Sequence, residues 1–188
     1  PGTFKDRHYL TTDPHRMIEG ILVAAKVVGI EHCYIYMRDE YPEILELLRK
    51  ELALVHEAGL DDHTILELRR GAGAYICGEE SAMIESIEGK RGLPRHRPPY
   101  VAEVGLFGRP TLVNNVETLY WVRDIVEKGA DWFNAQGRDG HAGFRTYSVS
   151  GRVANPGLVT CAAGASVNEL IEACGGMAED HSFKGYLP

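Results

Sequence analysis

The order of apolar segments in the first half of the chain most constrains its fold. Residues 33–37 and 65–69 are both rich in apolar side chains, and each segment predicts a buried strand. Between them, apolar side chains recur at helical spacing from about Pro42 to Ala58. A strand, a helix and a second strand predict an α/β fold with a Rossmann-like parallel sheet and flanking helices. Ligands of such sheets collect beyond the carboxyl ends of the strands.

Local signals predict where the helices begin and end. Asp13 before Pro14 is typical of an N-cap and a first helical residue, and that helix is expected to stop near Gly29. The helix from Pro42 is expected to end at Gly59. A helix that opens at residue 114 is expected to carry one apolar stripe, and residues 130–133 are expected to form a short helical turn. The stripe consists of Val116, Leu119, Val122 and Val126.

A glycine-rich segment, residues 71–81, follows the second predicted strand. Gly71, Gly73 and Gly78 permit positive φ and close approach of the main chain to a ligand. The spacing from Gly73 to Gly78 matches a phosphate-binding loop, but Glu79 and Glu80 replace its lysine and hydroxyl and would repel a triphosphate. The loop therefore suits a ribityl chain, a ribose or a nicotinamide. The alternative is a tight connection from strand to helix, capped by Glu79.

Two further segments add groups that suit a dinucleotide. Residues 88–100 combine four cations with glycine and proline, and Arg95, His96 and Arg97 are candidates to face phosphates. Tyr100, after two prolines, is a candidate stacking surface. Residues 108–118 include Asn114 and Asn115, which offer amide donors at the start of a helix. The alternative for the cationic run is a solvated basic loop.

Composition restricts the class of protein. The chain has 188 residues and a formal charge of −7, which argues against a nonspecific nucleic-acid binder. No apolar run approaches the roughly 20 residues that span a bilayer, so direct membrane insertion is not expected. The four cysteines lack C-x-x-C spacing, which supports neither zinc nor an iron–sulfur cluster and favours reduced thiols in the cytoplasm. Cys33 is expected in the core, and Cys77 is expected to approach a ligand of the glycine loop.

The last quarter of the chain predicts a second domain. A polar, glycine-rich linker at residues 137–143 is expected to separate it from the first. Residues 144–150 and 158–161 predict two strands of a hairpin, and Ser166 is expected to open a helix that ends at Gly175.

Four ordered segments, 1–7, 71–81, 88–94 and 108–118, resemble the signature segments of one family. It is the FMN- and NADH-binding flavoprotein subunit of respiratory complex I, shared with the diaphorase subunits of NAD-dependent formate dehydrogenases and NAD-reducing hydrogenases. In that family hydride passes from NADH to FMN, and electrons then leave to iron–sulfur clusters. The resemblance therefore implies an NADH dehydrogenase in which the flavin supplies the chemistry and no side chain acts as a catalyst.

The resemblance also implies which residues bind the cofactors. The loop from Gly71 to Glu80 would line the flavin and the nicotinamide, Arg97 and Tyr100 would meet the pyrophosphate and adenine of NADH, and residues 114–118 would meet the flavin ribityl chain and phosphate. In full, the implied cofactor-binding residues are Gly71, Gly73, Tyr75, Gly78, Glu79, Glu80, Arg97, Tyr100, Asn114, Asn115 and Thr118.

The implied domains are an FMN- and NADH-binding α/β domain at residues 1–136, the linker at 137–143, and the start of a β-grasp, ubiquitin-like domain at 144–188. The family's flavin-phosphate loop would precede Pro1, and its 4Fe-4S cysteines would follow Pro188. The segment alone is therefore expected to be inactive and to hold no cluster. Expected partners are iron–sulfur subunits of a larger redox complex, at the cytoplasmic face of a membrane. The alternative is a catalytically silent assembly module that docks a partner through the β-grasp domain.

Overall fold

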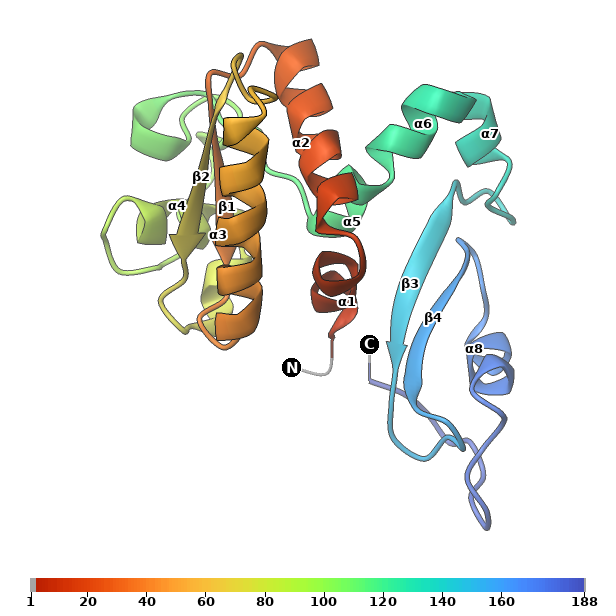
Figure 1. Ribbon diagram of the computed structural model, residues 1–188. Helices are drawn as coiled ribbons and strands as arrows, with labels where there is room; N and C mark the ends of the chain where they lie inside the picture. The colour runs from red at the N-terminus through yellow and green to blue at the C-terminus, as the bar shows by residue number, and fades with distance from the viewer. Residues whose placement is uncertain (1–2, 188) are drawn as a thin grey trace.

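A parallel pair of strands forms the centre of the first lobe in the computed structural model, which describes residues 3–187 (Figure 1). β1 (His32–Met37) pairs with β2 (Ile65–Arg70), and α3 (Pro42–Glu57) connects them. The predicted strand, helix, strand unit is thus confirmed. The other elements of this lobe are α1 (Lys5–Thr12), α2 (Pro14–Val28), a 3-10 helix at Tyr75–Gly78, α4 (Glu80–Ile87), and a 3-10 turn at Leu106–Gly108.

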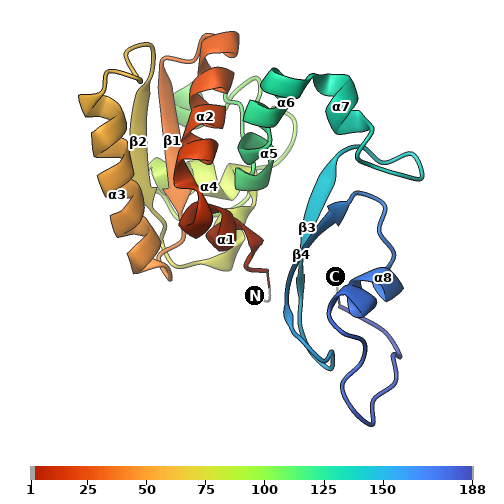
Figure 2. The ribbon, with the colours of Figure 1, turned by 45° about the vertical axis from the view of Figure 1, so that its right-hand side comes forward.

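Alternation along β1 divides the first lobe into layers. Ile35 and Met37 belong to the main core cluster, together with apolar side chains of α2 and α3, so these helices cover one face of the sheet. Tyr34 packs into a second cluster, built around Ile84 of α4 and Val101. Figure 2 shows α2 and α3 on the near side of the strands and α4 behind them. The glycine loop therefore passes from the sheet to its less covered face.

The predicted ends of α2 and α3 are confirmed. The Asp13 carboxylate accepts a hydrogen bond from the Arg16 amide at 3.1 Å, so it satisfies one free N–H group at the start of α2. Gly29 ends that helix with φ of 76°. At the other end of the connection, α3 stops at Glu57, and Gly59 follows with φ of 64°.

The helical segment after residue 114 differs from the prediction. It breaks at Trp121 into α5 (Val116–Tyr120) and α6 (Val122–Lys128), and α7 (Ala130–Asn134) follows as the expected short turn. The single apolar stripe is wrong, because the break rotates α6 and leaves Val126 65% exposed. α5 packs closely on α2, where a Cβ on Gly20 would overlap the carbonyl oxygen of Leu119.

The second lobe contains the predicted hairpin and helix. β3 (Phe144–Val149) and β4 (Gly157–Ala162) are antiparallel, and α8 (Val167–Ala173) packs beside them (Figure 1). Ser166 and Glu169 form a capping box at the start of α8. Within the predicted linker, the Arg138 amide donates to the Ala163 carbonyl at 3.0 Å, so this segment is bound to the end of β4.

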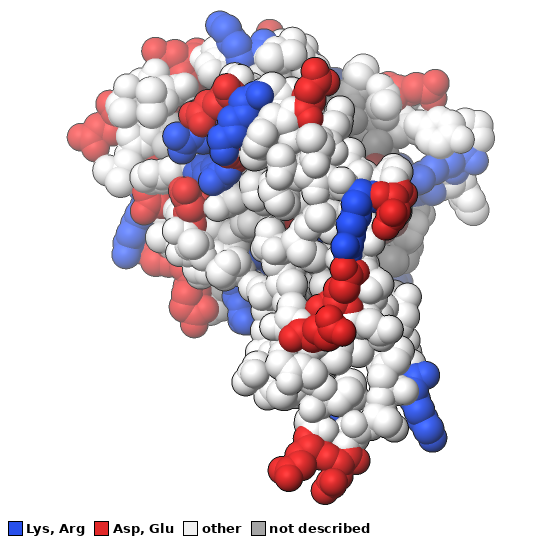
Figure 3. Space-filling model, turned by 90° about the vertical axis from the view of Figure 1, so that its right-hand side faces the viewer, with Lys and Arg blue, Asp and Glu red and all other residues white. Residues whose placement is uncertain are grey.

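Charges are dispersed on the side of the molecule that carries the second lobe. Figure 3 shows small groups of acidic and basic side chains separated by uncharged surface. This face therefore presents no extended field of one sign. Within residues 3–187, no helix is both long and apolar enough to cross a membrane.

Candidate functional site

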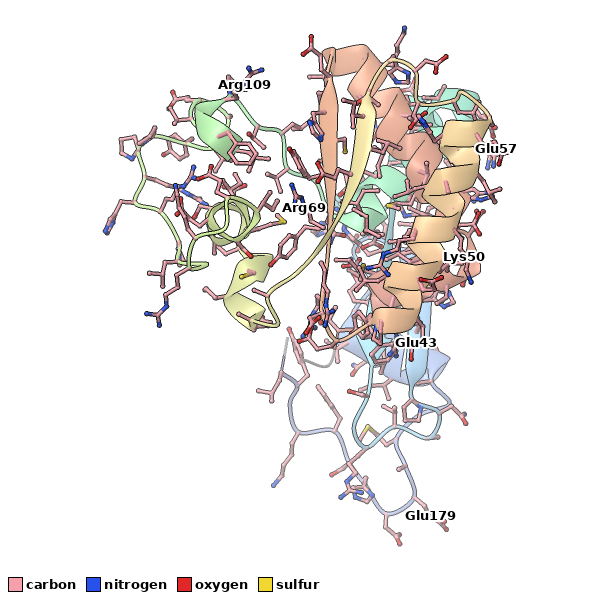
Figure 4. The ribbon with its side chains drawn as sticks, turned by 60° about the vertical axis from the view of Figure 1, so that its left-hand side comes forward. Glu43, Lys50, Glu57, Arg69, Arg109 and Glu179 are labelled. Carbon is pink, nitrogen blue, oxygen red and sulfur yellow. The ribbon has the colours of Figure 1, made fainter. Side chains whose placement is uncertain are left out.

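The glycine loop starts where β2 ends and is tied to β1. The Gly71 amide donates to the Met37 carbonyl at 2.7 Å, which continues the parallel ladder by one bond. The Tyr36 hydroxyl accepts from the Ala72 amide at 3.2 Å and lies 2.9 Å from Ser86 Oγ of α4. Figure 4 shows the path from the strand that carries Arg69 to α4, on the opposite side of the sheet from α3. The loop is thus fixed at the carboxyl ends of both strands.

The three glycines of the loop serve different purposes. Gly73 adopts φ of 73°, which favours glycine. Gly71 lies close to Tyr36, since a Cβ there would stand 3.1 Å from the aromatic ring. Gly78 needs neither property, and no atom lies within 4 Å of the place where its Cβ would be. The prediction of positive φ therefore holds for Gly73 alone, while the main chain at Gly78 is open to close approach.

Glu79 has a clear local role as the N-cap of α4. Its Oε2 accepts from the Ala82 amide at 2.9 Å and from Ser81 Oγ at 2.6 Å. Burial alone would raise the pKa of Glu79, but these hydrogen bonds and the nearby Arg97 charge outweigh it, so its pKa is lowered. The capped-connection interpretation is thus correct for Glu79, and the carboxylate is held ionised.

Arg97 joins the two neighbouring carboxylates. Its Nη2 lies 2.7 Å from Glu79 Oε1 and 2.7 Å from Glu80 Oε1. All three side chains are between 32% and 41% exposed, so solvent screens this ion pair and leaves it able to exchange partners. Arg97 is the only side chain that donates a hydrogen bond to Glu80 among the described residues.

The cationic segment is only partly available to a ligand. Arg95 binds Glu85 at 2.5 Å and Glu88 at 3.1 Å, and its Nη1 also donates to the Gly105 carbonyl at 3.1 Å. These contacts fasten residues 88–108 to α4, so the prediction that Arg95 faces phosphates is wrong. His96 and Arg97 remain exposed.

Two tyrosines flank this region with exposed rings. Tyr100 is 55% exposed, which suits its predicted role as a stacking surface, and Tyr75, predicted to line the cofactors, is 75% exposed. Cys77, between the glycines, is instead only 4% exposed and faces Gly92, where a Cβ would clash with its sulfur. The expectation that Cys77 approaches a ligand is therefore wrong. Cys33, which was expected in the core, is partly buried and packs against it, and this burial raises the pKa of its thiol to about 11.

The asparagines lie at the start of α5. Asn115 is its N-cap, because Oδ1 accepts from the Glu117 amide at 3.0 Å. Asn114 and Thr118 are exposed and make no side-chain hydrogen bond among residues 3–187. Asn114 also lines a groove of about 1030 Å³, which runs along β1 and includes Tyr36 and Met83. The groove thus places Asn114 on the same surface as Tyr36, whose hydroxyl binds the Ala72 amide of the glycine loop.

Two supporting residues were not predicted. Ser81 is 1% exposed and links the site internally, since Oγ donates to Glu79 and accepts from the Arg95 amide at 2.8 Å. Tyr36 positions the loop from the neighbouring strand. Its place at the carboxyl end of a predicted parallel strand was a usable signal, whereas the role of Ser81 depends on contacts distant in sequence. Among the described residues, no group of three or more His, Cys, Asp or Glu side chains could hold a metal ion.

Models of known families match both lobes. The Nuo51 FMN-binding domain matches residues 1–124, and the SLBB domain matches residues 146–185. Pro1 and Gly2, which open the first signature segment, lie outside the described residues.

Individual relatives agree with these matches. An NADH-quinone oxidoreductase subunit of Rhizobium meliloti (strain 1021) is 44% identical over 100% of this chain and 47% of its own length. The corresponding NADH-quinone oxidoreductase subunit of Streptomyces coelicolor is 41% identical over 100% of this chain and 44% of its own. The crystal structure of an NAD+-reducing [NiFe]-hydrogenase in the H2-reduced state is 44% identical with a TM-score of 0.87, over 93% of this chain and 30% of that one. The chain thus spans less than half the length of these curated relatives.

Proposed function

Because this chain belongs to the Nuo51 FMN-binding family, we propose that it is the cofactor-binding core of a subunit that transfers hydride between NADH and FMN. The resemblance to complex I and hydrogenase subunits is confirmed by the relatives and by the matched hydrogenase structure. The α/β fold with a parallel sheet, followed by a β-grasp-like domain, is confirmed as well. The activity itself, its substrates and its partners belong to the whole protein and are proposals for this chain.

One observation carries the proposal: an open glycine loop at the carboxyl end of a parallel strand, followed at once by paired carboxylates. Gly73 turns the main chain, and the space over Gly78 lets a flat ring approach it. The donor chemistry also fits, because Glu80 can accept hydrogen bonds from hydroxyl or amide groups. When bound, FMN accepts hydride from NADH and releases the electrons one at a time.

The protein groups are left with binding and orientation. Gly71, Gly73 and Gly78 present main chain to the rings, and Tyr75 offers an exposed aromatic face beside them. Glu79 holds the start of α4 and hence the position of Glu80. We assign the flavin ribityl and phosphate side to Asn114, Asn115 and Thr118, which is supported by the exposure of these side chains.

Arg97 and Tyr100 are the proposed contacts for the pyrophosphate and adenine of NADH. The Arg97 guanidinium is exposed and shared between two carboxylates, so an anionic pyrophosphate would compete with them for it. Release of Arg97 would leave Glu80 free to accept from the nicotinamide amide. Binding of the NADH pyrophosphate would thus free the carboxylate that accepts the hydrogen bond from the nicotinamide amide.

The electron acceptor is proposed from the relatives. They are named as subunits of NADH-quinone oxidoreductase, and the matched structure is an NAD+-reducing hydrogenase. We propose iron–sulfur subunits of such a complex as partners. A 4Fe-4S cluster would belong to the full subunit, since the cysteines of this chain lie apart as Cys33, Cys77, Cys161 and Cys174.

Uptake of FMN by the complete subunit tests the proposal. We expect wild-type protein to quench flavin fluorescence on binding, and Gly73→Val to abolish this, because a β-branched residue resists positive φ. Gly89→Val is the matched control, since Gly89 also has positive φ but lies after α4. A wild-type subunit that binds neither FMN nor NADH would leave the silent assembly module as the correct account. Normal flavin uptake by Gly73→Val would show that the loop only connects β2 to α4 and does not bind the flavin.

A further inference from the structure

A buried carboxylate joins the flavin-side helix to the second lobe. Glu117 of α5 is 7% exposed. Its Oε1 accepts from the Thr146 amide of β3 at 2.8 Å and from the Tyr9 hydroxyl at 3.2 Å. The Thr146 hydroxyl in turn lies 2.8 Å from Thr160 Oγ1 of β4. Figure 1 shows α1 and α5 beside β3, where the two lobes meet.

The other oxygen of this carboxylate leads back to the proposed site. Glu117 Oε2 lies 3.1 Å from Lys5 Nζ. The same ammonium donates to Asn115 Oδ1 at 3.0 Å and pairs with Asp6 at 2.6 Å. Asp6 also accepts from Asn115 Nδ2 at 3.0 Å. The amide of Asn115 is thus held at both ends by residues that are not expected to touch a cofactor.

The cost of burying a charge indicates that the role of Glu117 depends on its pairing with Lys5. A buried carboxylate without a counter-charge is costly, and Lys5, with 19% side-chain exposure, supplies that charge. A neutral glutamine at position 117 would still accept from the β3 amide, although more weakly than a carboxylate does. It would lose the ionic attraction for Lys5 altogether. The charge on Glu117 therefore matters most on the Lys5 and Asn115 side of the network.

We propose that Glu117 and Lys5 are positioning residues of the cofactor site, which orient Asn115 and couple it to the seating of the second lobe against α5. The inference rests on the proposed function, because it takes residues 114–118 as the flavin side. Supporting groups of this kind orient ligand-binding groups, and loss of one costs about 10–100-fold in affinity at metal sites. We expect the lower end of that range here.

The test measures FMN affinity of the complete subunit by fluorescence quenching, alongside its melting temperature. Glu117→Gln and Lys5→Met should each weaken FMN binding about tenfold. The double variant should lose little more than either single one, because both changes break the same link. Lys5→Arg, which keeps a cationic donor, should restore most of the affinity.

Two control variants separate positioning from stability. Thr160→Val removes the hydrogen bond between Thr146 and Thr160, which lies wholly within the second lobe, and should lower the melting temperature while leaving FMN affinity unchanged. Glu127→Gln removes an exposed carboxylate from neighbouring α6 and should change neither. If Glu117→Gln and Lys5→Met both bind FMN within twofold of wild type, the inference about Glu117 and Lys5 is wrong, while the proposed function stands. A wild-type subunit without FMN affinity would overturn the proposed function, and the inference with it.

Discussion

At the scale of single residues, Glu79 and Glu80 are neighbours with different surroundings. One carboxylate oxygen of Glu79 accepts the N-cap hydrogen bond of α4, whereas Glu80 is bound by Arg97 alone among the described side chains. The sequence predicts an acidic helix start but not this division, because it depends on how Ser81 and Arg97 fold back onto the loop. The distinction makes Glu80 the better candidate to face the nicotinamide.

Replacement of Glu80 by glutamine should change nicotinamide binding and leave FMN bound. The oxidised ring is cationic and the reduced ring is neutral, so we expect NAD+ affinity to fall more than NADH affinity, by roughly fivefold to tenfold. Titration of the FMN-loaded complete subunit with both nucleotides measures this. Glu57→Gln, on α3 across the sheet (Figure 4), is the matched control. Equal affinities in wild type and Glu80→Gln would remove Glu80 from the site.

Tyr100 tests the proposed adenine contact. Tyr100→Ala should weaken dinucleotide binding by about 1–3 kcal/mol if the exposed ring stacks on adenine, the magnitude known for base–aromatic stacking. Tyr100→Phe keeps the ring and should bind normally. Calorimetry with NADH distinguishes them, and similar losses in both variants would point to the hydroxyl instead of the aromatic face.

At the scale of elements, prediction succeeds where the signal is local. Asp13, Gly29 and Ser166 mark helix ends correctly because capping depends on a few adjacent residues. The prediction of one apolar stripe from Val116 to Val126 fails because the helix breaks at Trp121, within an aromatic cluster. The Trp121 ring stacks on the Phe144 ring of β3, with 5.0 Å between the ring centroids. Contacts between distant segments decide such breaks, and spacing alone does not reveal them.

The crossing of α2 and α5 gives a prediction about stability. An alanine at an exposed helical glycine normally stabilises by about 0.5–1 kcal/mol. At Gly20 the new methyl would collide with the Leu119 carbonyl, so we expect Gly20→Ala to lower the free energy of unfolding by about 1–3 kcal/mol. Urea denaturation measures the change. The reverse substitution Ala53→Gly, at an exposed site on α3, calibrates the intrinsic preference. A stabilised Gly20→Ala variant would contradict the packing.

The cap of α8 predicts a dependence on pH. Arg138 and the Ser166 amide and hydroxyl lower the pKa of Glu169 from 4.5 to about 2. The stabilisation is therefore complete above about pH 4.5 and is lost as the pH falls toward 2. The difference in unfolding free energy between wild type and Glu169→Gln should be constant at neutral pH and vanish over that interval. A difference that persists at pH 2 would show that the charge is not responsible.

At the scale of the whole molecule, the two lobes are joined more closely than the sequence suggests. Composition predicts a polar, glycine-rich linker at residues 137–143, and Arg138 fastens this linker to the second lobe by binding the end of β4 and pairing with Glu169. Glu117 then joins the first lobe to the second, from α5 to β3. The family and the order of elements could be predicted from motifs. The junctions could not, because each brings together residues far apart in the chain.

We propose above all that the open loop from Gly71 to Glu80 holds a flavin that exchanges hydride with NADH. The most direct measurement is the visible flavin absorbance of the complete FMN-loaded subunit, without oxygen, as NADH is added. We expect this absorbance to bleach in proportion to the NADH added. A bound flavin whose absorbance stays unchanged at saturating NADH would contradict it.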